Sequence, residues 1–175
     1  PHYDLLSIPY FAILSTKNAL KRLIFGKMDD KNKNHIIMVG EEYTQETLFK
    51  NLDIGKWQNQ LGDNSLETQK KFLRLSDFII NSTDEEFKKN FDQYLNLESS
   101  LNYYVLCNIL NIADNVAKNL IFVTYNGKVW YPTLYDLDTS FGAYYNGTNL
   151  YEPNYIVPLE NNTFFKRINQ LFYLL

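Results

Sequence analysis

Apolar side chains recur every three to four positions through the middle of the chain, which is the spacing of an amphipathic helix. A helix is therefore predicted over residues 65–80, with Asn64 and Glu67 three positions apart as a capping pair. Its apolar stripe is expected to consist of Phe72, Leu75, Phe78 and Ile79. A last helix is predicted from Thr163 to the end of the chain.

A second helix is predicted to begin directly after the first, in a run of small polar and acidic residues. Either Ser82 with Glu85 or Thr83 with Glu86 fits a capping box, in which a hydroxyl and a carboxylate satisfy the first free backbone N–H groups. Both registers are compatible with the sequence.

A third helix is predicted over residues 97–113, and we expect it to be largely buried because apolar residues follow one of its faces. Cys107 lies in this apolar stretch and is the only cysteine, so it can form no internal disulfide. We expect it to be a buried thiol of the core rather than a nucleophile. The predicted stripe comprises Leu101, Tyr104, Val105, Ile109 and Ile112.

The first third of the chain has weaker patterns. Helices are predicted over 16–25 and 44–51, and a short strand rich in β-branched residues over 35–39. The polar segment 26–34 is predicted to be a loop. The Gly- and Asn-containing stretch 55–63 is predicted to be a break between helices.

Two β-rich runs, 120–125 and 128–131, are separated only by Asn126-Gly127. This pattern predicts a β-hairpin with a type I′ turn, because such a turn needs positive φ at both of its central residues. The Gly-, Asn- and Tyr-rich stretch 143–154 that follows is predicted to be an irregular surface loop.

Composition places the chain among folded globular proteins. Of its 175 residues, 45 % are hydrophobic and 16 % aromatic, which is enough apolar surface to offset the entropy of folding. The length corresponds to about one domain. We therefore expect one α+β domain over 1–175, mostly helical, with a β-hairpin at about 120–133.

Charge and motifs exclude several functions. The net charge of −3 is too negative for nucleic acid to be the main partner, and no stretch approaches the ~18 apolar residues of a membrane-spanning helix. One cysteine and two histidines cannot form a Cys/His zinc site. The motifs of common serine hydrolases, zinc proteases and P-loop enzymes are absent.

Four polar residues around the predicted hairpin are the candidates for chemistry. Asp114 and Asn119 form the pattern D-x-x-x-x-N before the hairpin, and Asp136 and Asp138 follow it. Since the two strands of a hairpin are antiparallel, we expect the chain to return Asp136 beside Asn119. Each residue also has an ordinary explanation. Asp114 could be a loop residue after a helix, and Asp136 and Asp138 a polar edge or calcium ligands.

The order of these features resembles the catalytic core of protein kinases. There a loop Asp takes the proton of the substrate hydroxyl, an Asn five residues later holds a magnesium ion, and a hairpin leads to a second metal-binding Asp. Hard cations prefer oxygen ligands, and an Asn carbonyl together with an Asp carboxylate supplies two of them.

The segment from Asn119 to Gly142 resembles, more specifically, the CotH family, the spore-coat-H type of atypical protein kinase. The resemblance is best over about residues 72–142, and Tyr135 stands where the family usually has Trp. The segments that carry the resemblance are Trp130-Tyr131-Pro132, Tyr135-Asp136-Leu137-Asp138 and Ser140-Phe141-Gly142, and the last two follow the family pattern W-D-x-D-x-x-F-G.

The resemblance implies a kinase-like fold that transfers the γ-phosphoryl group of ATP to protein Ser or Thr with Mg²⁺ or Mn²⁺. On the matching positions, Asp114 would be the catalytic base. Asn119 and Asp136 would bind the metal and the nucleotide, and Asp138 would be a second metal ligand or would position one.

The phosphate-gripping part of a kinase has no clear counterpart upstream. No Gly-rich loop precedes the candidate residues, and Lys17, Lys21 and Lys27 are the available lysines for this task. The segment 35–42 is only a weak analogue of the strand and hinge between two kinase lobes. We therefore expect a fragment holding mainly the C-terminal lobe, with the ATP-binding lobe absent or incomplete.

Two alternatives to an active kinase remain. One is a catalytically inactive CotH-like module that serves structure or binding in a bacterial surface protein or a phage tail or baseplate. The other is an adhesive domain in which Asp136 and Asp138 bind calcium. We expect a protein substrate if the chain is an active kinase, and a structural partner if it is an inactive CotH-like module. The resemblance implies a location on the bacterial spore coat, cell surface or phage virion.

Overall fold

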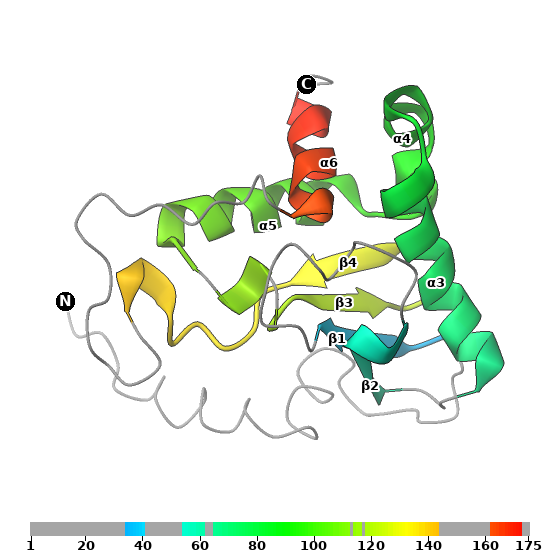
Figure 1. Ribbon diagram of the computed structural model, residues 1–175, viewed down its shortest axis with the longest axis horizontal. Helices are drawn as coiled ribbons and strands as arrows, with labels where there is room; N and C mark the ends of the chain where they lie inside the picture. Colours follow the sequence, from blue (N-terminus) through cyan, green and yellow to red (C-terminus); the bar gives the residue numbers. More distant parts are fainter. Residues whose placement is uncertain are drawn as a thin grey trace.

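The computed structural model describes residues 34–40, 54–61, 65–112, 114–116, 118–143 and 162–172. In this part of the chain, helices pack over one face of a small antiparallel sheet (Figure 1). The fold is α+β and mostly helical, as the sequence predicts. The helices predicted over 16–25 and 44–51 lie outside the described residues, as does nearly all of the segments 26–34 and 143–154.

The sheet has four antiparallel strands in the order β2-β1-β3-β4. The central strands, β1 (Ile36–Gly40) and β3 (Ile121–Thr124), are buried along their whole length. The edge strands are β2 (Trp57–Leu61) and β4 (Trp130–Thr133). Pro132 is tolerated within β4 because an edge strand has one side without a ladder to complete. The strand predicted over residues 35–39 is confirmed as β1.

Strand β2 shows that the predicted break over 55–63 is wrong. A turn of 3₁₀ helix, η1 (Ile54–Lys56), leads into β2, which pairs with β1. The Trp57 ring is buried 4.6 Å from the ring of Phe72, centroid to centroid. The segment Trp-Gln-Asn-Gln-Leu has no β-branched residue, so pairing and burial rather than local propensity place it in the sheet.

The predicted helices are confirmed to within a few residues. The N-cap of α3 is Ser65, whose hydroxyl accepts the N–H of Thr68 at 3.3 Å, so the cap predicted at Asn64 is one residue too early. Between α3 and α4, Thr83 and Glu86 form the capping box, which decides between the two registers. The described part of the chain has four α-helices, which are α3 (Leu66–Asn81), α4 (Asp84–Asn90), α5 (Leu97–Leu110) and α6 (Thr163–Leu171).

The buried face of α5 agrees only in part with the predicted stripe, of which Ile112 is buried and Leu101 and Tyr104 pack partly buried against the core. Ser100, Tyr103 and Cys107 point into the core, whereas Val105 and Ile109 are 38 % and 68 % exposed. The helix is apolar on nearly every side, so the sequence pattern could not select a face. Packing against β4 and α6 selects it. The prediction that Cys107 is a buried thiol is confirmed.

The β3–β4 hairpin is confirmed, but its predicted type I′ turn is wrong. Thr124 pairs with Trp130, so the connection has five residues, and Gly127 alone among them has positive φ, at 69°. The Asn126 side-chain carbonyl accepts the N–H groups of Lys128 and Val129, both at 2.9 Å. The Asn126 side chain therefore makes the hydrogen bonds that close this loop, whereas in a two-residue turn backbone groups would make them.

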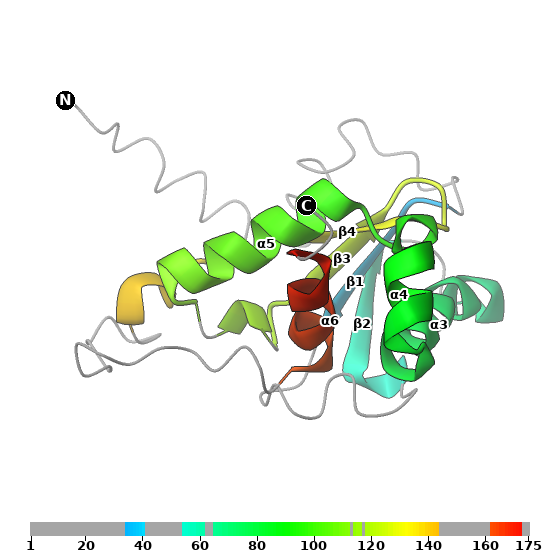
Figure 2. The same cartoon turned by 90° about the horizontal axis from the view of Figure 1, so that it is seen from above.

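One aromatic core joins the sheet to the helices. The ring of Phe72 on α3 meets that of Trp130 on β4 edge-on at 5.2 Å, and Phe122 on β3 meets Phe164 on α6 at 5.0 Å. Figure 2, seen from above, shows α5 and α6 crossing over the strands. No helix in the described ranges is long and apolar enough to cross a bilayer.

Candidate functional site

The candidate residues lie at one end of the sheet. Ile121 pairs with Thr133, so Asn119 before β3 and the segment after β4 start from the same end of the hairpin. Figures 1 and 2 both show the C-terminal end of α5 and the two 3₁₀ turns, η3 (Asp114–Val116) and η4 (Ser140–Gly142), at this end. The helices α3 and α4 lie at the opposite end.

The turn η3, which begins with Asp114, is anchored by two helices. The hydroxyl of Tyr103 on α5 donates to the carbonyl oxygen of Asn115 at 2.5 Å. The side-chain amide of Asn162, the N-cap of α6, donates to the carbonyl oxygen of Val116 at 2.8 Å. Since buried carbonyls need partners, these bonds fix the backbone that carries Asp114.

The side chain of Asn115 joins this turn to the segment after β4. Its amide oxygen accepts the N–H of Tyr135 at 3.1 Å, and its amide nitrogen donates to the carbonyl oxygen of Asp136 at 3.3 Å. Asn115 is fully buried. The Asn115 side chain therefore uses both its donor and its acceptor on the backbone of two consecutive residues, Tyr135 and Asp136. These bonds fix the position of the turn that carries Asp114 relative to the backbone of Asp136.

The segment after β4 contains two residues in the left-handed backbone region. Asp136 has φ of 53° and Phe141 has φ of 58°. Asp tolerates this region better than most residues, but a bulky side chain such as Phe does so at a cost of about 1–3 kcal/mol. The Phe141 side chain is also 77 % exposed. Backbone strain of this kind is concentrated at functional sites.

Comparison with protein-family models identifies the family of the chain. The family model described as CotH kinase protein matches residues 22–171, which is most of the chain. The chain belongs to the CotH kinase protein family. The match includes every described helix and strand, so this is a kinase-like domain. No curated protein is similar enough to count as a match.

Two of the oxygen donors that the CotH resemblance assigns to a divalent cation, Asn119 and Asp138, make no side-chain interaction in the described part of the chain. The Asn119 side chain is mostly buried and makes no hydrogen bond within the described residues. The Asp138 carboxylate is exposed and likewise has no partner there. Beside it, the Thr139 hydroxyl is buried and has no hydrogen-bond partner among the described residues. One amide and two carboxylates fit the preference of Mg²⁺ and Mn²⁺ for few protein ligands.

The Tyr135 hydroxyl, at this end of the CotH domain, has a raised pKa. Burial, and then the charge of the Asp136 carboxylate, raise the pKa of the Tyr135 hydroxyl. No group of three His, Cys, Asp or Glu side chains that could hold a metal occurs in the described part of the chain. A cation would therefore depend on Asn119 and on oxygens of the substrate in addition to the two carboxylates.

Three residues that support the site have no marked signal in the sequence. Tyr103, Asn115 and Asn162 act through buried hydrogen bonds between elements that are far apart in the chain. Asn115 falls inside the D-x-x-x-x-N interval of the CotH family pattern, where any residue is allowed. Its role becomes visible only when the segment after β4 is placed beside it.

Proposed function

We propose that this CotH domain is an atypical protein kinase that transfers the γ-phosphoryl group of ATP to a Ser or Thr hydroxyl of a protein. The bridge through Asn115 is the main support, since it holds the turn that carries Asp114 against the backbone of Asp136. Phosphoryl transfer depends mostly on positioning and on electrostatic stabilisation, and a rigid link between the two acidic segments serves both.

Asp114 has the role of general base in this proposal. Its carboxylate accepts the proton of the Ser or Thr hydroxyl as the hydroxyl oxygen bonds to the γ-phosphorus. The bond between that phosphorus and the bridging oxygen breaks, and ADP leaves. The Tyr103 and Asn162 anchors restrict the backbone of the turn, so little ordering is needed when the substrate binds.

Asn119, Asp136 and Asp138 are the residues that would hold Mg²⁺ or Mn²⁺. The bound cation would neutralise phosphate charge. The neutral Asn119 amide adds a ligand without adding negative charge, which favours an anionic substrate beside two carboxylates.

Thermal unfolding tests the binding part of the proposal. Mg²⁺ or Mn²⁺ together with ATP should raise the melting temperature, since a ligand present at a hundredfold excess over its Kd stabilises the folded state by about 2.7 kcal/mol. Asp136→Asn should lose this rise. Asp92→Asn, a matched change at an exposed carboxylate of the turn η2 (Phe91–Gln93), should keep it. An equal rise in both variants would contradict the metal role of Asp136.

Transfer of labelled phosphate from ATP to a Ser/Thr protein substrate tests the chemical part. Asp114→Asn should lower transfer by about 10²–10⁴-fold, because it removes the base, and should leave the ATP-dependent rise in melting temperature unchanged. A wild-type chain that binds metal and ATP but transfers nothing would favour the catalytically inactive binding module instead. A rise with Ca²⁺ alone, with no effect of ATP, would favour a calcium-stabilised domain.

A further inference from the structure

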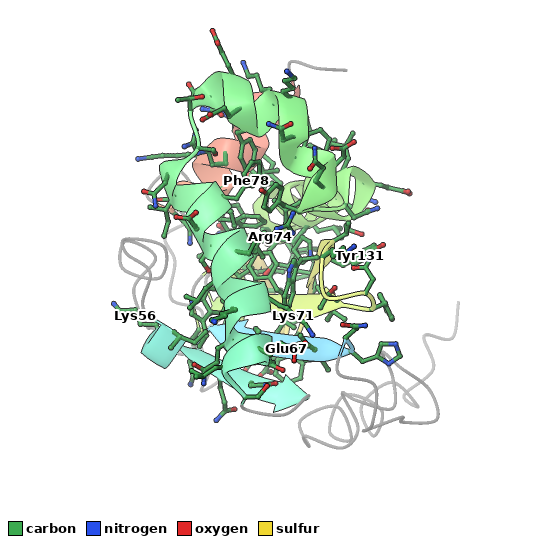
Figure 3. All side chains as sticks on the ribbon, turned by 90° about the vertical axis from the view of Figure 1, so that its right-hand side faces the viewer. Lys56, Glu67, Lys71, Arg74, Phe78 and Tyr131 are labelled. Atoms are coloured by element: carbon green, nitrogen blue, oxygen red, sulfur yellow. The ribbon has the colours of Figure 1, made fainter. Side chains whose placement is uncertain are left out.

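A cavity of about 740 Å³ lies between α3 and the loop of the β3–β4 hairpin. It is at the opposite end of the hairpin from Asp114, separated from it by the length of β3, which is roughly 13 Å for four residues. Figure 3 shows Glu67, Lys71 and Arg74 in a row along α3, the helix that forms one wall. The hairpin loop, with Lys128, forms the other wall.

The cavity is basic although the chain is acidic. Its described lining contains four cationic side chains and a single carboxylate, that of Glu67, whereas the whole chain has a net charge of −3. A concave surface lined by one sign of charge concentrates the electric field and attracts ions of the opposite sign. The four cations are Lys70, Lys71, Arg74 and Lys128.

Two of these cations have no partner among the residues that the structure describes. The ammonium groups of Lys70 and Lys128 form no ion pair or hydrogen bond in the described part of the chain. Lys71, by contrast, pairs with Glu67 at 3.2 Å. This ion pair shows that a carboxylate can bind a lysine on this wall. Lys70 and Lys128 could each bind a carboxylate of another molecule in the same way.

Arg74 is held in place with most of its donors unused. Its guanidinium lies 4.0 Å from the centre of the Tyr94 ring, and one N–H donates to the carbonyl oxygen of Lys128 at 3.3 Å. A guanidinium has five N–H donors, so the stacked plane can still bind an anion. Stacking on an aromatic ring reduces the entropy that such binding would cost.

The opposite wall, formed by the loop of the β3–β4 hairpin, is held rigid by hydrogen bonds within that loop. The Asn126 side chain bonds two backbone N–H groups of the loop, and Gly127 packs against α3. A Cβ at Gly127 would lie 3.1 Å from Cδ of Lys71 and 3.1 Å from the side-chain oxygen of Asn34, so only glycine allows this approach without displacement. The cavity is therefore preformed, which favours binding.

We propose that this basic cavity, here called the basic groove, binds an Asp- or Glu-rich segment of a partner protein, with its carboxylates against Lys70, Arg74 and Lys128. The cations are spread over two walls and do not converge on one point. Lys70 and Arg74 are about 6 Å apart along the axis of α3, and Lys128 is across the groove. Such a spread suits several anionic groups along a chain, and the volume is within the ~300–1,000 Å³ of ligand sites.

This inference does not rest on kinase activity. The groove and the turn carrying Asp114 are at opposite ends of the hairpin, so an acidic segment can occupy the groove whether or not phosphoryl transfer takes place. Binding of a peptide therefore succeeds or fails independently of the proposed function.

Fluorescence anisotropy of a labelled hexaglutamate peptide with the 175-residue chain tests the groove. We expect saturable binding that weakens as salt is added, and no binding of the matched hexaglutamine peptide. The double variant Lys70→Gln/Lys128→Gln should bind about tenfold more weakly, as the loss of two exposed ion pairs predicts. The matched double variant Lys89→Gln/Lys166→Gln has the same change in net charge outside the groove, and it should bind like the wild type.

Competition identifies the source of the anionic groups. Stronger displacement by hexaglutamate than by a phosphoserine peptide supports the Asp- or Glu-rich segment, and the reverse would overturn it in favour of a phosphorylated one. Displacement by inorganic phosphate at the same concentration as the peptides would overturn the proposal in favour of a simple anion site. Tighter binding of a single-stranded oligonucleotide, or equal peptide affinity in the two double variants, would also overturn it.

Discussion

The Tyr103 hydroxyl donates a hydrogen bond of 2.5 Å to the main-chain carbonyl of Asn115, twelve positions further along the chain. The same Asn115 uses its side chain on the backbone of Tyr135 and Asp136. One continuous series of hydrogen bonds therefore connects the core face of α5, the turn carrying Asp114 and the exit from β4. The Tyr103 bond is buried and the two Asn115 side-chain bonds are partly buried, so each one is costly to leave unsatisfied.

Removal of the Tyr103 hydroxyl should loosen this series at its origin. Tyr103→Phe keeps the ring and its packing on Phe165 but leaves the Asn115 carbonyl without its partner. We expect the free energy of unfolding in urea to fall by about 1–2 kcal/mol. Tyr131→Phe is the matched control, because its hydroxyl makes no hydrogen bond in the described residues, and it should change stability by less than about 0.5 kcal/mol. Equal losses would show that the Asn115 bond contributes nothing.

Removal of the Asn115 side chain should affect the site more than any surface change. Asn115→Ala leaves the N–H of Tyr135 and the carbonyl of Asp136 without their partner, so we expect a loss of about 2–3 kcal/mol and a weaker response to metal and ATP. Asn108→Ala removes an exposed amide bond to the Tyr104 carbonyl and should cost less than about 0.5 kcal/mol. An unchanged response to metal and ATP in Asn115→Ala would contradict its positioning role.

The Cys107 thiol should make the folded state less stable at alkaline pH. Burial raises the pKa of this thiol from 9.0 to about 12. Between these values the unfolded chain releases a proton that the folded chain retains, so stability is complete below pH 9 and falls as the pH rises toward 12. We expect a loss of about 1 kcal/mol between pH 8 and 10.

Urea unfolding at several pH values measures this effect, with Cys107→Ala as the comparison. The variant should be less stable at neutral pH, because it leaves a small cavity, but it should lose less stability between pH 8 and 10. Parallel curves for the two proteins would mean that the thiol does not titrate in this interval. In the native wild type, the thiol should also resist alkylating reagents because it is buried.

Arg167 links α6 to the junction between α3 and α4, and its geometry should matter more than its charge. Its guanidinium donates to the carbonyl oxygens of Ile79 and Ser82 and pairs with Asp84 at 2.6 Å. Arg167→Lys keeps the charge but not the fork of donors, so we expect a loss of about 2 kcal/mol. Asp84→Asn should cost less than about 1 kcal/mol, because this carboxylate is two-thirds exposed.

Thermal and urea unfolding of the two variants would compare these contributions. Lys166→Arg, at the exposed position next to Arg167, is the control and should leave stability unchanged within about 0.5 kcal/mol. If Asp84→Asn is as destabilising as Arg167→Lys, the ion pair and not the two carbonyl contacts would hold this junction.

The helices with strong local signals could be predicted from the sequence. The spacing of Phe72, Leu75 and Ile79 marks the buried side of α3, and the polar run at its end marks the start of α4. The β3–β4 hairpin is predictable for the same reason, since two β-rich runs flank a turn-forming pair. In these segments local propensity and tertiary packing agree.

The order of the candidate residues along the chain is visible in the sequence, but the contacts that support their backbone are not. Asp114, Asn119 and Asp136 follow a recognisable order along the chain, and the antiparallel hairpin explains why they start from one end of it. Asn115 has no distinguishing pattern, because its partners are the backbone groups of Tyr135 and Asp136. Because nearly every residue has the same backbone N–H and C=O groups, a sequence does not show which of them will bind a given side chain.

Sequence alone determined that this chain is a mostly helical α+β domain of CotH type with a hairpin between its acidic residues. Tertiary structure decided three features for which the local sequence signal was weak or ambiguous. They are the strand that begins at Trp57, the face of α5 that packs into the core and the loop closed by Asn126. The physical reason is common to all three. Each depends on which distant surface removes an apolar side chain from water or completes a backbone hydrogen bond, and that surface exists only in the folded chain.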